Sequence, residues 1–101
     1  MKLLTKELRE QFPKLCSNND KTPQEIPIIA KFFDPTGSWT WYATEFDGED
    51  IFFGYVRGFE NEFGTFSLKE LESVDGRLGL GIERDIHFGK HMLFEAMEKQ
   101  I

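Results

Sequence analysis

The chain has 101 residues, of which 40% are hydrophobic and 30% charged, and its formal net charge is −6. This composition is typical of a globular protein and excludes a disordered chain, so we expect one domain spanning residues 1–101. The charge is uneven: residues 45–85 hold eleven acids against four bases, a net −7, whereas residues 1–44 carry +1 and residues 86–101 carry zero. Because phosphate neutralisation needs clustered Lys or Arg, we expect no direct binding to nucleic acid.

Cys16 is the one cysteine of the chain, so an intrachain disulfide is excluded and a reducing compartment is favoured. The residues beside Cys16 include no histidine or cation that would activate its thiol. No apolar run approaches the roughly 18 residues of a membrane span, and no secretion signal is present. We therefore expect a cytoplasmic protein that does not bind a membrane.

The first predicted element is a short helix that starts at Thr5. Thr5 is suited to cap its N-terminus, and Leu4, Leu8 and Phe12 fall on one face. Pro13 ends the helix, because proline cannot donate the main-chain hydrogen bond that a helix interior requires.

Three strands joined by short turns follow, from about Pro27 to Arg57. The first two, Ile28–Phe33 and Trp39–Phe46, are joined by a turn at Asp34–Gly37, in which Pro35 has the required φ. Asp47-Gly48 is a strong hairpin signal, and the third strand is Ile51–Arg57. The pattern predicts an antiparallel β-meander.

Alternation along the second strand assigns its side chains to two faces of the sheet. One face is expected to hold Trp39, Trp41 and Ala43. The other is expected to hold Thr40, Tyr42, Thr44 and Phe46.

The remainder of the chain predicts further short elements. Phe63–Phe66 resembles a fourth strand, and Ser67-Leu68-Lys69-Glu70 forms a capping box that starts a helix ending near Val74. Ile82–Phe88 is predicted as a strand or extended arm, and Met92–Lys99 as a final helix. Because strands and helices are segregated along the chain, we expect an α+β fold, a meander of three to five strands packed with two or three short helices.

Three patterns resemble chemical sites but are better explained by structure. The glycines of residues 76–81 follow a helix and lack the Lys-Ser/Thr of a phosphate-binding loop, so they predict a turn. His87 and His91 are four residues apart, but Gly89 between them opposes a helix. The acids of residues 45–50 match no calcium-loop spacing. We therefore predict no catalytic residue, no metal site and no cofactor, and we do not expect an enzyme.

Aromatic and acidic residues of the meander are the stronger candidates for binding. Most of the fifteen aromatic rings are expected in the core, but Trp39, Trp41 and Tyr42 occupy both faces of one strand, so some are expected at the surface. Arg84 is suited to clamp a carboxylate of the sheet. The acidic residues of the predicted surface are Glu45, Asp47, Glu49 and Asp50.

Several segments together resemble a bacterial family known as the domain of unknown function number 2958. The resemblance covers nearly the whole chain, in order and with similar spacing. It is carried by the following segments: 2–8 (KLLTKEL), 30–35 (AKFFDP), 39–42 (WTWY), 45–50 (EFDGED), 52–54 (FFG), 66–72 (FSLKELE) and 78–85 (LGLGIERD). The family brings no assigned active site.

The resemblance implies a biological setting, because such proteins are often encoded on plasmids, conjugative elements and phages beside anti-restriction genes. The leading hypothesis is therefore a non-enzymatic protein of a mobile element that counters host defence by binding a protein partner, such as a host nuclease or a CRISPR effector. The alternative is a small metal-dependent or hydrolytic enzyme centred on Glu83, Asp85 and His87. No prediction of oligomeric state follows from the sequence.

Overall fold

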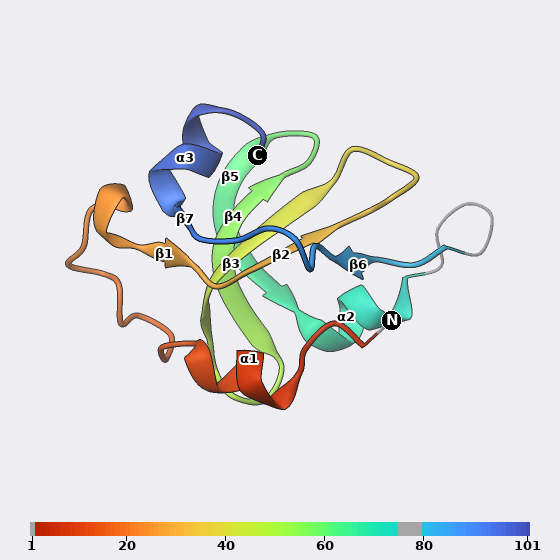
Figure 1. The fold of residues 1–101 in the computed structure, drawn as a ribbon, viewed down its shortest axis with the longest axis horizontal. Helices are drawn as coiled ribbons and strands as arrows, with labels where there is room; N and C mark the ends of the chain where they lie inside the picture. Colours follow the sequence, from red (N-terminus) through yellow and green to blue (C-terminus); the bar gives the residue numbers. More distant parts are fainter. Residues whose placement is uncertain (1, 75–79) are drawn as a thin grey trace.

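The computed structural model describes residues 2–74 and 80–101 and shows an α+β fold built on one central sheet (Figure 1). The elements are α1 (Lys6–Gln11), η1 (Pro23–Glu25), β1 (Pro27–Ile28), β2 (Ala30–Phe33), β3 (Thr40–Phe46), β4 (Ile51–Arg57), β5 (Asn61–Ser67), α2 (Leu68–Ser73), β6 (Glu83–Arg84), β7 (His91–Met92) and α3 (Leu93–Glu98). In Figure 1, α1 lies at the bottom of the view and α3 at the top. No described helix combines the length and apolar character needed to cross a membrane.

The central sheet has five antiparallel strands in the order β5-β4-β3-β2-β6, which confirms the predicted meander. The predicted fourth strand is real and longer than expected, because β5 spans Asn61–Ser67. The predicted first strand, in contrast, is divided. Ile28 belongs to β1 (Pro27–Ile28), which leaves the sheet to pair with β7, and Ala30–Phe33 form β2, with Ile29 between the two strands.

The prediction that Phe46 shares a face with Tyr42 is wrong. A β-bulge shifts the register of β3 against β4 between Ala43 and Glu45. Because the bulge inserts one residue, it reverses the alternation beyond it. Phe46 therefore packs on the same side as Ala43, in a different core cluster from Tyr42.

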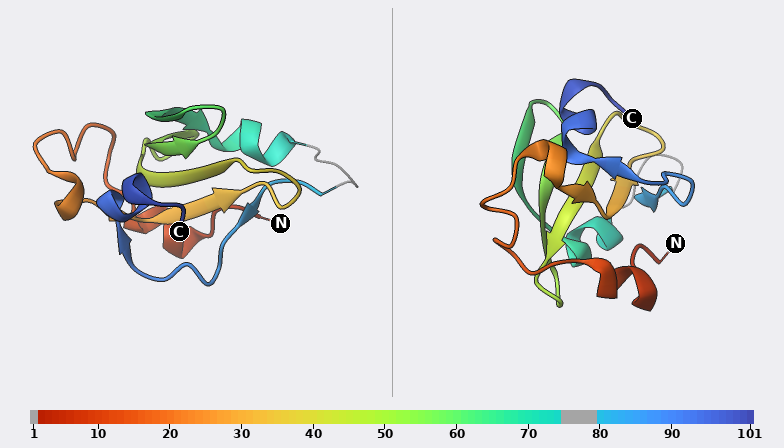
Figure 2. Two further views of the ribbon diagram at one scale, coloured as in Figure 1. Left: turned by 90° about the horizontal axis from the view of Figure 1, so that it is seen from above. Right: turned by 60° about the vertical axis from the view of Figure 1, so that its left-hand side comes forward.

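Two hydrophobic clusters cover opposite faces of the sheet. The first contains Phe32, Phe46 and Phe52, and it is closed by the N-terminal segment, α2 and Ile82. The second contains Tyr42 and Tyr55 together with the buried Ile26 and Ile28, and it is closed by α3. Figure 2 shows the sheet between these coverings and β5 at its outer edge, with α2 continuing from β5.

Capping by short polar side chains begins α1 and α2 as predicted. The Thr5 hydroxyl accepts a hydrogen bond from Leu8 N–H at 3.1 Å, and the Ser67 hydroxyl accepts one from Glu70 N–H at 3.2 Å. The predicted extended arm from Ile82 to Phe88 is mostly irregular, because only Glu83–Arg84 pairs with β2. The final predicted helix is α3.

Candidate interaction surface

Glu45 lies inside the protein, although it is predicted as part of an acidic surface. Its side chain is only 3% exposed. Its two carboxylate oxygens accept hydrogen bonds of 2.8 Å from the main-chain N–H groups of Cys16 and Asn18. Glu45 thereby holds the 14–20 loop against the sheet, where Cys16 adopts a φ of 71°. A buried carboxylate with both oxygens used internally is not available to a partner.

Asp47 forms the turn between β3 and β4. Its Oδ1 accepts hydrogen bonds from the main-chain N–H groups of Glu49, Asp50 and Ile51 at 2.8, 2.8 and 3.0 Å. These bonds, that from Asp50 above all, favour the charged carboxylate and hold the pKa of Asp47 below its usual value. Gly48 supplies the positive φ of 90° that the turn requires.

Asp50 joins this turn to the start of α2. Its oxygens accept hydrogen bonds from Lys69 N–H at 2.8 Å and from the Ser67 hydroxyl at 2.7 Å. The hydrogen bond from Lys69 N–H, followed by that from Ser67, lowers the pKa of Asp50. Of the four predicted surface acids, Glu49 is therefore the one whose side chain is exposed and not used in these contacts.

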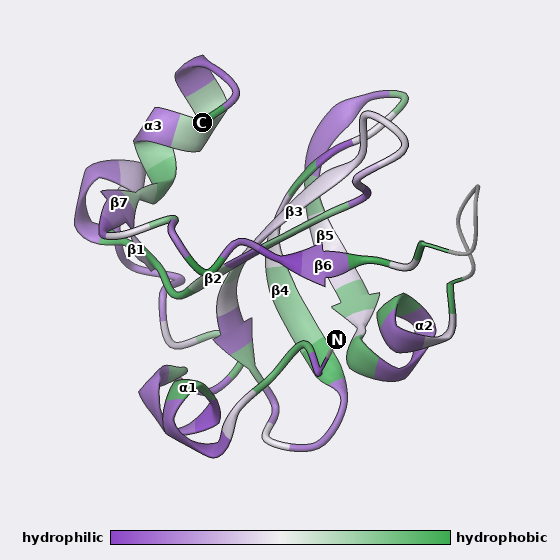
Figure 3. Cartoon of the chain, turned by 45° about the vertical axis from the view of Figure 1, so that its right-hand side comes forward, coloured by the Kyte–Doolittle hydropathy of each residue, from purple (hydrophilic) through white to green (hydrophobic). Residues whose placement is uncertain are grey.

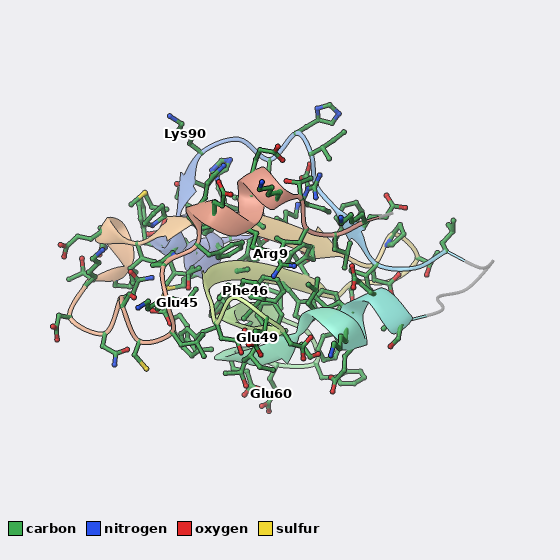
Figure 4. All side chains as sticks on the ribbon, turned by 90° about the horizontal axis from the view of Figure 1, so that it is seen from below. Arg9, Glu45, Phe46, Glu49, Glu60 and Lys90 are labelled. Carbon is green, nitrogen blue, oxygen red and sulfur yellow. The ribbon has the colours of Figure 1, made fainter. Side chains whose placement is uncertain are left out.

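The acidic tip, residues 45–50 around the turn between β3 and β4, is also contacted by a cation from α1. The Arg9 guanidinium lies 5.2 Å from the centre of the Phe46 ring and donates a 2.8 Å hydrogen bond to the carbonyl of Gly48. Figure 4 shows Arg9 beside Phe46. The acidic tip is thus part of the framework of the protein, held from β3, α1 and α2.

Tyr42 and Arg84 also make internal contacts. Tyr42 is fully buried, and its hydroxyl hydrogen-bonds with the carbonyl and N–H of Ile101, each at 3.2 Å. Burial raises the pKa of Tyr42. Arg84 donates a 2.8 Å hydrogen bond to the main-chain carbonyl of Leu3, which fixes the N-terminal segment across β6.

Trp39, Trp41 and Phe59 form an aromatic cluster at one end of the sheet. The two indoles stack with their centroids 5.8 Å apart, and the Phe59 ring meets Trp39 edge-on at 5.3 Å. Both tryptophans are half-buried, whereas Phe59 is 94% exposed. Gly58 leaves room for the Trp39 ring, because a Cβ there would collide with it.

Phe59 was not singled out by sequence reasoning. It lies in the turn between β4 and β5, and only the tertiary structure places it against Trp39, twenty residues earlier in the chain. A signal was present in Gly58-Phe59-Glu60, since a large apolar residue at a polar turn is unusual.

A second aromatic group lies on the opposite face, beside β5. Phe63 stacks nearly parallel to Phe53, with centroids 6.3 Å apart, and meets the edge of Tyr55 at 5.1 Å. Phe63 is 44% exposed. This face is therefore apolar where the sheet ends at β5.

The residues of the alternative enzyme centre lie in β6 and the segment after it, where Glu83 and Asp85 are half-buried and His87 is exposed. Asp85 accepts a hydrogen bond from His87 N–H at 3.0 Å and pairs with Lys31 Nζ at 3.4 Å, so its charge has a structural partner. His91 lies instead in β7, just before α3, with its Nδ1 3.1 Å from Glu95 Oε1. Within residues 2–74 and 80–101, no three His, Cys, Asp or Glu side chains gather as a metal site. Most of the predicted glycine turn at 76–81 lies outside the described residues.

A cleft of about 290 Å³ between α1 and the segment from Arg84 to Gly89 does not change this assessment. Three of the charged side chains that line it, Lys31, Arg84 and Asp85, are engaged in the contacts described above. The aromatic cluster and β5, in contrast, present the exposed rings of Phe59 and Phe63.

The comparisons with known proteins agree with the resemblance. Neither curated proteins nor solved structures give a match. A family model described as "Protein of unknown function (DUF2958)" matches residues 3–98, nearly the whole chain. The chain therefore belongs to the DUF2958 family.

Proposed function

We propose that this protein is a non-enzymatic interaction protein of plasmid or phage origin, which counters a host defence by binding a protein through the aromatic cluster. The partner class is a restriction nuclease or a CRISPR effector. The observation that carries the proposal is Phe59, a large apolar ring that is 94% exposed and supported from one side by Trp39.

An exposed aromatic ring on a rigid support is suited to be a binding anchor. Trp and Tyr lead the residues that dominate binding energy, and a Phe ring that becomes buried contributes about 2–3 kcal/mol. Trp39 is held between Trp41 and Gly58, so little conformational freedom remains to be lost on binding. The cluster is therefore preorganised.

Acidic side chains beside the cluster suit a basic partner. Glu60 and Glu62 are exposed and lie one and three residues after Phe59 in the chain. Glu60 lies in the turn after β4, whereas the acids of residues 45–50 surround the turn before β4, at the other end of that strand. Nucleases present basic surfaces to DNA, and an acidic surface steers association with such patches. The acidic part of the proposed surface thus moves from the Glu45–Asp50 tip to Glu60 and Glu62.

The setting of the proposal comes from the resemblance described above, since proteins of this kind are often encoded on mobile elements beside anti-restriction genes. The test is therefore made in cells. Unmodified phage is plated on bacteria that express a restriction nuclease, or a CRISPR effector with a matching guide, with and without this protein. We expect the protein to raise plating efficiency in at least one of the two systems.

Two variants connect that effect to the cluster. Phe59→Ser is expected to remove the protection, because it deletes the anchor while leaving the fold intact. Ile86→Ser is the matched control, since Ile86 is 64% exposed but lies away from the cluster. Protection in neither system, or equal protection by wild type and Phe59→Ser, would contradict the proposal.

A further inference from the structure

The strand β5 forms one edge of the central sheet along its whole length. Its seven residues, Asn61–Ser67, pair with β4 without a break in register. In the described ranges 2–74 and 80–101, no strand pairs with its other side. Figure 2 shows β5 as the outermost ribbon of the sheet.

Two hydrogen bonds determine which main-chain groups of β5 point outward. Gly58 N–H donates to the carbonyl of Glu60 at 3.2 Å, and Leu68 N–H donates to the carbonyl of Asp50 at 2.8 Å. Both belong to the same alternating series of the β4–β5 register. Residues of that series turn N–H and C=O towards β4: Glu62, Gly64 and Phe66. The intervening residues turn theirs to the free edge: Asn61, Phe63 and Thr65.

Exposed edge strands usually carry features that prevent pairing with another chain, such as proline, lysine, a bulge or a very short length. β5 has none of the four. The opposite edge of the same sheet differs, because β6 is only two residues long and hydrophilic (Figure 3). The unprotected edge is therefore confined to β5.

Side chains of β5 offer a different environment on each face. On one face Phe63 stacks with Phe53 and leaves an apolar surface. On the other face, Gly64 lies between Glu62 and Phe66, and a Cβ at Gly64 would meet nothing within 4 Å. That open space suits the aliphatic stem of a lysine or arginine whose charge reaches Glu62.

The charge around this edge has one sign. Residues 58–74 hold four glutamates and one lysine, which gives −3. The four glutamates, Glu60, Glu62, Glu70 and Glu72, are all exposed. A neighbouring strand with basic residues would be attracted, whereas a second copy of β5 would bring like charges together.

We propose that the outer edge of β5 binds an extended, basic segment of the partner protein, which adds to the sheet as a sixth strand. The inference rests on the proposed function and specifies how the partner is held. Main-chain hydrogen bonds to Asn61, Phe63 and Thr65 supply affinity, and alternate side chains of the segment supply specificity. Its apolar residues cover Phe63, and its basic residues cross Gly64 to Glu62.

A synthetic peptide tests this arrangement on the intact protein. The probe is an alternating Val-Lys peptide of about eight residues, the length of an ordinary strand. Amide exchange and chemical shifts are followed by NMR on the labelled protein. We expect exchange to slow at Asn61, Phe63 and Thr65, whose N–H groups become paired, and to change little at Gly64.

Two control peptides separate the sources of affinity. Replacing every lysine by glutamate is expected to abolish binding, because the edge is acidic. Methylating alternate main-chain nitrogens of the Val-Lys peptide is expected to weaken binding about tenfold or more, which corresponds to the loss of one or two hydrogen bonds. Equal binding of the glutamate peptide, absence of binding by the lysine peptide, or shifts confined to residues outside β5 would overturn the proposal.

A second copy of this chain is the other partner that could pair with the edge of β5. A dimer that slows exchange at Asn61, Phe63 and Thr65 without peptide would show that the edge pairs with itself, and would also overturn the proposal.

A protein variant separates this proposal from the proposed function. Thr65→Pro removes one outward N–H and leaves the β4 side of the ladder intact, so edge pairing weakens while the fold persists. Loss of protection in the phage assay with Thr65→Pro is expected. If Phe59→Ser abolishes protection and folded Thr65→Pro retains it in full, the proposed function stands and strand addition is rejected. If the peptide binds β5 but the protein gives no protection, strand addition stands and the proposed function is rejected.

Discussion

The two ends of β4 show how differently a hairpin turn can use its residues. At the start of β4, the acids Glu45, Asp47 and Asp50 accept seven hydrogen bonds from nearby main-chain and hydroxyl groups. At its other end, Phe59 is almost fully exposed and meets the Trp39 ring edge-on. The first turn stabilises the fold through these hydrogen bonds, whereas the second exposes a side chain that contributes little to stability.

This difference shows that a charged residue at a turn and an exposed aromatic ring have different implications for binding. Charged residues at a turn are common for backbone reasons, so their number says little about binding. An exposed aromatic ring has the opposite meaning, because leaving it in water forgoes the stabilisation that burial would bring. Variants at the two turns should therefore divide into those that change stability and those that change binding.

The largest effect is expected at Glu45. Glu45→Ala leaves the N–H groups of Cys16 and Asn18 without their acceptors and opens a space beside the sheet, so we expect the free energy of unfolding to fall by about 3 kcal/mol. Chemical denaturation measures this change. Glu49→Ala is the matched control in the same turn, and its effect should stay within about 0.5 kcal/mol. Equal effects of the two variants would show that burial of Glu45 is not what holds the loop.

A smaller and pH-dependent effect is expected at Asp50. Its pKa in the folded protein is lowered from 3.8, so the stability that it contributes is complete above that value and is lost as the pH falls through the folded-state pKa. Asp50→Asn should therefore lower the melting temperature near pH 7. Below pH 3.8 the difference between wild type and variant should shrink.

Thermal melts across this pH range make the measurement. Asp20→Asn changes an exposed aspartate of the 14–20 loop and serves as the control, with no expected difference near neutral pH. A constant difference between wild type and Asp50→Asn at all pH values would refute the role of the ionised carboxylate.

The smallest effect on stability is expected at Phe59. Because the ring is 94% exposed, Phe59→Ser should change the free energy of unfolding by no more than about 0.5 kcal/mol. Together with a loss of protection in the phage assay, this result would complete the contrast with Glu45. A large destabilisation would instead make Phe59 part of the fold and remove it as a free anchor.

Local sequence was sufficient for the elements and their order. Thr5 and Ser67 predict the starts of α1 and α2, and Asp47-Gly48 predicts the turn before β4, because capping and turn formation depend on residues only a few positions apart. The family was also recognisable from sequence segments that occur in the same order and with similar spacing. These features are local, so a linear pattern contains them.

Only the tertiary structure decided which side chains are available to a partner. The bulge after Ala43 moves Phe46 to the other face, and the 14–20 loop buries Glu45, from positions about thirty residues away. The tertiary structure likewise brings Phe59 against Trp39 and leaves β5 as a free edge of the sheet. Burial and pairing depend on contacts between distant segments, so alternation and composition determined the meander, while the fold determined what it exposes.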